Sequence, residues 1–93
     1  MTGAMLRVHG DLASTSFLPW ISRRAQLLSL RGWARRDSDA GVTIAVLGPG
    51  PLIDAMETAC LLGPMDVMVE GIVRETTIFA APPNGFDIAD ALG

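Results

Sequence analysis

The period of the apolar positions changes several times along the chain, and each change predicts a new element. Residues 5–9 alternate apolar and polar side chains, which is typical of a strand with one buried face. Over residues 17–30 the apolar positions recur every three or four residues, which predicts an amphipathic helix. Two further alternating runs, over about residues 31–36 and 42–47, flank a polar turn and predict a hairpin.

A second helix and a second long strand follow this hairpin. A break rich in glycine and proline ends the hairpin. The helical spacing of the next apolar residues then predicts a helix over residues 52–62. We expect a long strand over residues 67–79 with a bulge at Gly71, and a short edge strand over residues 85–88.

The predicted order is strand, helix, strand, strand, helix, strand, with one short strand at the end. This order is typical of an α+β domain of the ferredoxin-like type (βαββαβ), in which two helices cover one face of an antiparallel sheet. A chain of 93 residues is long enough for one hydrophobic core and too short for two. Residues 1–93 are therefore expected to form a single domain.

The composition narrows the classes of partner. A formal net charge of −3 gives no overall attraction to nucleic acid or to an anionic membrane, so neither is expected as a partner. The chain has one cysteine, Cys60, and one histidine, His9, so neither an internal disulfide nor a metal site is predicted, and no cofactor is expected. No apolar run reaches the length of a signal peptide or a membrane span, and we expect a soluble cytoplasmic protein.

The connection between the first strand and the first helix holds the main candidate binding residues. It is written HGDLASTSFL, and it leads to a helix N-terminus, where backbone amides face outward and favour anions. It contains no lysine or arginine, and no glycine after Gly10. The hydroxyls of Ser14, Thr15 and Ser16 can bind an anion or cap the helix, and capping is the favoured role. The sequence identifies no base near them that would activate a nucleophile.

His9 lies close to Asp11 in the sequence. A proton-transfer pair of these two residues is one interpretation. A histidine on the solvent side of a strand end explains the pattern equally well, and the sequence does not separate the two.

Several positions on this frame resemble the acylphosphatase family, whose members are small single-domain proteins of this topology. The first signature of that family runs from a glycine to an aromatic residue followed by arginine, and Gly10 and Phe17 stand at its glycine and aromatic positions. The second signature begins with a glycine, an aromatic, a small apolar and a basic residue, and residues 32–35, GWAR, match it. The resemblance covers almost the whole chain and implies a phosphate-binding loop over residues 11–16.

The two side chains that carry the family's reaction are replaced. In the family an arginine and the loop amides hold the phosphate, and an asparagine orients the attacking water. By this resemblance Leu18 stands at the arginine position and Arg36 at the asparagine position, while Ala13 and Ser14 replace a glutamine and a glycine of the loop. Leucine carries no charge, and a guanidinium donates hydrogen bonds but accepts none. Losing an arginine that meets the phosphoryl charge costs about 10³–10⁵ in rate, so hydrolysis of acyl phosphates is expected to be lost or residual.

The sequence therefore predicts an acylphosphatase-like domain that acts as a non-catalytic binding or interaction module. The alternative is a divergent acylphosphatase that hydrolyses the carboxyl-phosphate bond of acyl phosphates with the loop amides and Arg36, so whether the chain is an enzyme stays open. An Arg36 side chain beside the loop would favour the alternative, and a solvated arginine at a strand end would favour the first. The expected ligand is a small phosphorylated compound or a protein partner. The expected weak anion site, a remnant of the family's loop, comprises Asp11, Leu12, Ala13, Ser14, Thr15, Ser16 and Arg36.

Overall fold

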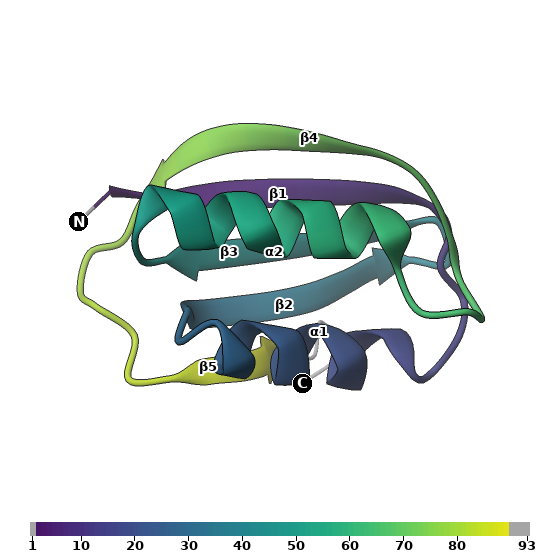
Figure 1. Ribbon diagram of the computed structural model, residues 1–93, viewed down its shortest axis with the longest axis horizontal. Coiled ribbons are helices and arrows are strands. Elements are labelled where there is room, and N and C mark those ends of the chain that lie inside the picture. Colours follow the sequence, from purple (N-terminus) through teal and green to yellow (C-terminus); the bar gives the residue numbers. More distant parts are fainter. Residues whose placement is uncertain (1, 90–93) are drawn as a thin grey trace.

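The computed structural model describes residues 2–89, which form five strands and two helices (Figure 1). The strands lie in one sheet in the order β4-β1-β3-β2-β5. Neighbouring strands are antiparallel except β5, which pairs in parallel with β2 and makes the sheet mixed. The elements are β1 (Thr2–Asp11), α1 (Phe17–Leu27), β2 (Arg31–Ser38), β3 (Gly41–Leu47), α2 (Gly50–Leu62), β4 (Met68–Ile78) and β5 (Phe86–Ala89). The predicted ferredoxin-like order is confirmed.

Two boundaries differ from the sequence-based expectation. Helix α1 ends at Leu27 rather than near Leu30, because Ser29 adopts a positive φ of 56° and turns the chain out of the helix. The bulge in β4 falls at Glu70 rather than at Gly71, since His9 pairs with Gly71 while the next residue of β1 already pairs with Val69.

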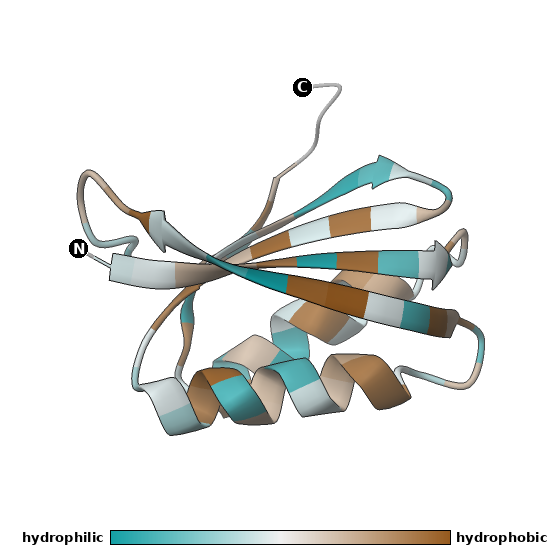
Figure 2. Ribbon diagram, turned by 90° about the horizontal axis from the view of Figure 1, so that it is seen from above, coloured by the Kyte–Doolittle hydropathy of each residue, from teal (hydrophilic) through white to brown (hydrophobic). Residues whose placement is uncertain are grey.

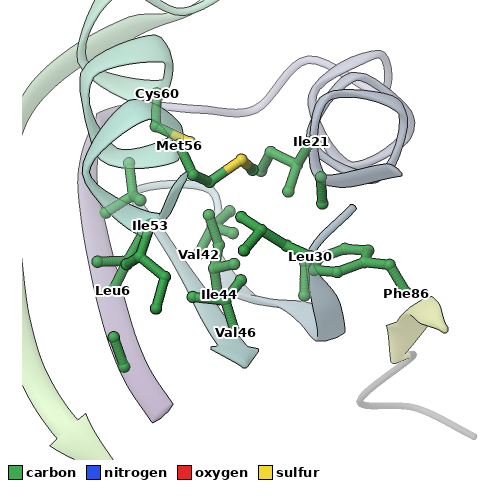
Figure 3. Close-up of a cluster of buried hydrophobic side chains, with 14 of the residues drawn as sticks. Leu6, Ile21, Leu30, Val42, Ile44, Val46, Ile53, Met56, Cys60 and Phe86 are labelled. Atoms are coloured by element: carbon green, nitrogen blue, oxygen red, sulfur yellow. The ribbon is translucent and has the colours of Figure 1, made fainter. Parts of the chain in front are cut away.

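Both helices cover the same face of the sheet, and the core lies between the two layers (Figure 2). The alternating residues Leu6 and Val8 of β1 point into this core, as their period predicts. Met56 of α2 reaches toward Ile21 of α1, and together they fill the space between the helices (Figure 3). This packing fixes where β1 ends and where α1 begins, which positions the connection between them.

No helix within residues 2–89 is both long enough and apolar enough to cross a membrane.

Candidate functional site

The loop between β1 and α1 is anchored to the sheet at its start. Gly10 has a φ of +152°, and its amide donates to the carbonyl of Ala40 at 3.2 Å. The amide of Leu12 donates to the carbonyl of Asp39 at 3.0 Å, and the Leu12 side chain is fully buried. Asp11 is exposed. From Ala13 onward the loop turns back toward the surface, so its anchored part presents residues 13–16 at one end of the sheet (Figure 1).

Arg36 reaches this loop from β2. It pairs in register with Val42, a core residue, so its side chain lies on the helix-covered face of the sheet. Its Nη1 donates to the carbonyl of Leu12 at 2.6 Å, and its Nη2 donates to the carbonyl of Ser14 at 2.9 Å. A third, longer bond runs from Nη1 to the carbonyl of Ser38 at 3.4 Å. Arg36 is therefore half-buried and fixed against the loop rather than being a solvated arginine at a strand end.

Leu18 lies in the first turn of α1 and is half-buried against the core. Its side chain adds neither charge nor hydrogen-bonding capacity to the loop. Among residues 2–89, the cation that contacts the loop is Arg36, which enters from the β2 side and not from the helix.

Backbone amides of the loop remain available to a ligand. Within residues 2–89 the amides of Ala13, Ser14 and Thr15 donate to no acceptor, and the amide of Ser16 donates to the Ser14 hydroxyl at 3.2 Å. These amides immediately precede the N-terminus of α1, where the helix macrodipole favours negative charge. The arrangement suits a small anion.

A carboxylate from another part of the chain already lies at the loop. Asp66, in the connection between α2 and β4, accepts hydrogen bonds on its Oδ2 from the hydroxyls of both Ser14 and Ser16, the latter at 2.6 Å. The two hydroxyl oxygens are 2.9 Å apart. The bonds from Ser14 and then Ser16 lower the pKa of the Asp66 carboxyl, which stays ionised and is a weak base.

Two expectations from the sequence change at this loop. Ser16 is the N-cap residue of α1, yet its side chain makes no capping hydrogen bond, because its backbone angles are helical (φ −82°, ψ −14°) rather than extended as in a capping residue; its hydroxyl donates to Asp66. Thr15 makes no capping bond either. A titratable group also lies within hydrogen-bond distance of the loop hydroxyls, although none was identifiable from the sequence.

The sequence held an indirect signal for Asp66. Strand β4 pairs antiparallel with β1, and Met68 is opposite Asp11 in that pairing. Residues just before Met68 must then lie beside residues just after Asp11. Asp66 stands two positions before Met68, so it follows from the register of the pair, which the sequence pattern left open.

The remaining candidate residues do not assemble into a site. His9 and Asp11 make neither a hydrogen bond nor an ion pair with each other in the described part of the chain, and the His9 ring lies against Gly71 on β4. Burial raises the pKa of the Cys60 thiol to about 12, so the thiol is protonated and unreactive at neutral pH. Among residues 2–89, no group of three or more histidine, cysteine and carboxylate side chains could hold a metal ion.

Apolar side chains border the loop on the β4 side. Met65 and Met68, on either side of Asp66 and Val67, are both exposed. An anion bound at residues 13–16 would therefore have apolar surface next to it, which suits a ligand with an apolar group attached to its charged end.

Comparison with known proteins identifies the family. A sequence model of the acylphosphatase family matches residues 4–88. The acylphosphatase of Rhizobium meliloti (strain 1021) is 32% identical over 85 residues, covering 91% of this chain and 90% of its own, and that of Acidiphilium cryptum (strain JF-5) is 35% identical over 83 residues, covering 89% and 88%. The crystal structure of an acylphosphatase from Bacillus subtilis superposes with a TM-score of 0.86 at 21% identity, covering 96% of this chain and 99% of that one. The chain belongs to the acylphosphatase family.

Proposed function

We propose that the part of the loop at residues 13–16, together with Arg36, binds the phosphoryl group of an acyl phosphate, and that the chain hydrolyses this compound far more slowly than a family member with the arginine and the asparagine in place. Binding is supported by the fixed guanidinium of Arg36, bonded to the carbonyls of Leu12 and Ser14 beside three unpaired loop amides within the described residues. The observation that carries slow hydrolysis is Leu18, which is half-buried against the core and has no charge to offer a phosphoryl oxygen, whereas the position of Arg36 by itself favours the divergent enzyme. Amides and one fixed cation are sufficient for an anion.

Binding without fast hydrolysis follows from the same side chains. Phosphoryl transfer needs little covalent work from a protein, so its rate depends on holding the equatorial oxygens and on positioning the water. Leu18 cannot hold an oxygen, and Arg36 cannot accept a hydrogen bond from water. Asp66 can accept one, but its negative charge lies at the same loop hydroxyls and would repel a phosphoryl group bound there. The domain therefore serves chiefly as a binding module for a small phosphorylated compound.

A second candidate is a divergent acylphosphatase that uses Arg36 in place of the missing arginine. One observation favours it, since the Arg36 guanidinium lies at the loop, as this mechanism requires. An arginine carries five N–H groups, and the three bonds that Arg36 makes within residues 2–89 leave two for a phosphoryl oxygen. The names of the curated relatives support the same reaction.

Kinetics with benzoyl phosphate separate the two candidates. We expect the wild-type protein to hydrolyse it at close to the uncatalysed rate, because both side chains of the family's reaction are absent. Arg36→Lys keeps the charge and Arg36→Ala removes it, so these variants form a matched pair. Turnover well above the uncatalysed rate that survives in Arg36→Lys and falls by about 10²-fold or more in Arg36→Ala would establish the divergent enzyme instead.

A phosphate titration followed by NMR tests the binding site. We expect inorganic phosphate to shift the amide resonances of residues 13–16, with a Kd weaker than about 1 mM, which corresponds to about 4 kcal/mol or less. The Arg23–Arg24 pair on α1 is the internal control, because both side chains are exposed and lie outside the loop. Shifts confined to that pair, with none at residues 13–16, would contradict the proposed site.

A further inference from the structure

The carboxylate of Asp66 lies at the loop and carries a negative charge where an anionic ligand would bind. The Oδ2 atom of Asp66 accepts both the Ser14 and the Ser16 hydroxyl, so these two hydroxyl donors are already engaged and an anion would be left with the loop amides and Arg36. The Asp66 side chain is exposed and its connection leads directly into β4, which is paired with β1. The carboxylate is thus held at the loop by the sheet and by the two hydroxyls together.

This position has a consequence for the charge of any ligand. A second anion placed among the loop amides would lie close to the Asp66 carboxylate, and two like charges at such a separation repel even in water. A fully ionised phosphoryl group carries two negative charges, so the carboxylate repels it more strongly than it repels a singly charged group. A singly ionised phosphoryl group meets less of it, and its P–OH can donate a hydrogen bond to the carboxylate.

We propose that Asp66 determines which phosphoryl anion the loop binds. The P–OH group of a singly ionised ligand donates a hydrogen bond to the Asp66 carboxylate, whereas a doubly ionised ligand is repelled by it. This inference rests on the proposed anion site and specifies its ligand as a protonated, singly charged phosphoryl group. In the part of the chain that the structure describes, the other charged residues next to the loop are Arg36 from β2, Asp11 at the end of β1, and Asp39, whose carbonyl accepts the Leu12 amide.

The acidity of the ligand then controls binding. The hydroxyl bonds keep Asp66 ionised through the pH range 5–8, because they lower its pKa from a value that is already below this range. A phosphate monoester changes from one charge to two around its second pKa of about 6. The wild-type protein should therefore bind a phosphate monoester at least about fivefold more tightly at pH 5 than at pH 8.

The test compares ethyl phosphate with ethyl sulfate by NMR titration at pH 5 and pH 8. Ethyl sulfate carries one charge and no proton at both values, so its affinity should not change. Asp66→Asn should bind ethyl phosphate about five- to tenfold more tightly than the wild type at pH 8, and its preference should reverse toward the doubly charged form, which Arg36 attracts more strongly. Asp11→Asn makes the same charge change at the same loop without touching the hydroxyls and is the matched control, with a smaller effect expected.

The outcomes separate this inference from the proposed function. If ethyl phosphate shifts residues 13–16 equally at both pH values and equally in Asp66→Asn, the loop binds anions but Asp66 does not select them, which overturns the inference alone. If ethyl sulfate gains affinity at pH 5 in parallel, a change in the protein rather than in the ligand's charge is responsible, and the inference is also overturned. If neither compound binds the wild type or Asp66→Asn, the proposed anion site fails, and the inference fails with it.

Discussion

The double variant Leu18→Arg with Arg36→Asn is expected to hydrolyse benzoyl phosphate at least about 10³-fold faster than the wild-type protein. The change places an arginine and an asparagine at the positions where the acylphosphatase signatures have them. The arginine supplies the charge that meets the equatorial phosphoryl oxygens, and the asparagine supplies an acceptor for the attacking water. Each single change should give much less, since the oriented water helps only when the phosphate is held.

The contacts of Leu18 and Arg36 determine how much stability this double variant loses. Leu18 packs against the core, so an arginine there loses part of a buried side chain and lowers stability by about 1 kcal/mol, while its aliphatic stem keeps some of the contact. Arg36→Asn removes the bonds to the carbonyls of Leu12 and Ser14, and water can replace them at this half-buried site. Recovery is larger if Ser14→Gly is added, because glycine admits loop conformations that serine resists.

A matched control separates the register of the signature from a simple change of charge. Arg35 neighbours Arg36 in β2, but it pairs with Asp37 at 2.9 Å and lies over Trp33, with 5.3 Å from its guanidinium carbon to the ring centroid. It therefore faces away from the loop. Leu18→Arg with Arg35→Asn has the same net charge as the double variant and should recover little. A folded Leu18→Arg, Arg36→Asn, Ser14→Gly protein that neither binds phosphate nor hydrolyses benzoyl phosphate would refute the assignment of both positions.

Most of the fold was predictable because it depends on local patterns. Apolar residues alternate along a strand with one buried face, and they recur every three to four residues along a helix that covers a sheet. The burial of Leu6, Val8 and Ile21 could therefore be predicted from the pattern. The predicted end of α1 was wrong because Ser29 adopts a positive φ. This conformation is uncommon for serine, so the residue type gives no sign of it. The parallel pairing of β5 with β2 depends on the path of the chain between them rather than on either strand's own residues.

The site was predictable only where it lies within one stretch of sequence or one signature. Residues 11–16 and Arg36 followed from the resemblance to the family's two signatures, and the structure brings that side chain to that loop. Asp66 did not, because about fifty positions separate it from Ser14 and Ser16, and only the β1–β4 register brings them together. The favoured role of the hydroxyls as helix caps was wrong, because Ser16 adopts helical rather than extended backbone angles, which the sequence pattern does not show. Contacts between loops depend on register, and periodicity does not determine register.

The register between β1 and β4 shifts at Gly10. Gly10→Ala is expected to lower the free energy of unfolding by about 3 kcal/mol or more. Gly10 has a φ of +152°, and a Cβ built on it would lie 2.1 Å from the carbonyl oxygen of Met68 and 2.8 Å from the amide nitrogen of Glu70. Both are backbone atoms of β4, so no side chain can move aside. The two strands must separate at the bulge, which lies next to the end of β1 and four residues after Asp66. Urea denaturation at pH 7 measures the loss, and a stability of about 5–15 kcal/mol for a domain makes it large.

Variants of two other glycines test whether Gly10→Ala loses phosphate binding through lower stability or through a displaced loop. Gly50→Ala should change stability by less than about 1 kcal/mol, because nothing lies within 4 Å of its added Cβ at the start of α2. Gly32→Ala should destabilise about as much as Gly10→Ala, since its φ is +144° and its Cβ would lie 1.9 Å from the carbonyl oxygen of Ala45. Its strain, however, lies between β2 and β3, at the end of β2 away from Arg36. Under conditions where each protein is folded, Gly32→Ala should keep the phosphate-induced shifts of residues 13–16, and Gly10→Ala should lose them. Equal retention in both would show that the bulge does not position the loop, and an unchanged stability of Gly10→Ala would show that β4 does not approach it as closely as these distances require.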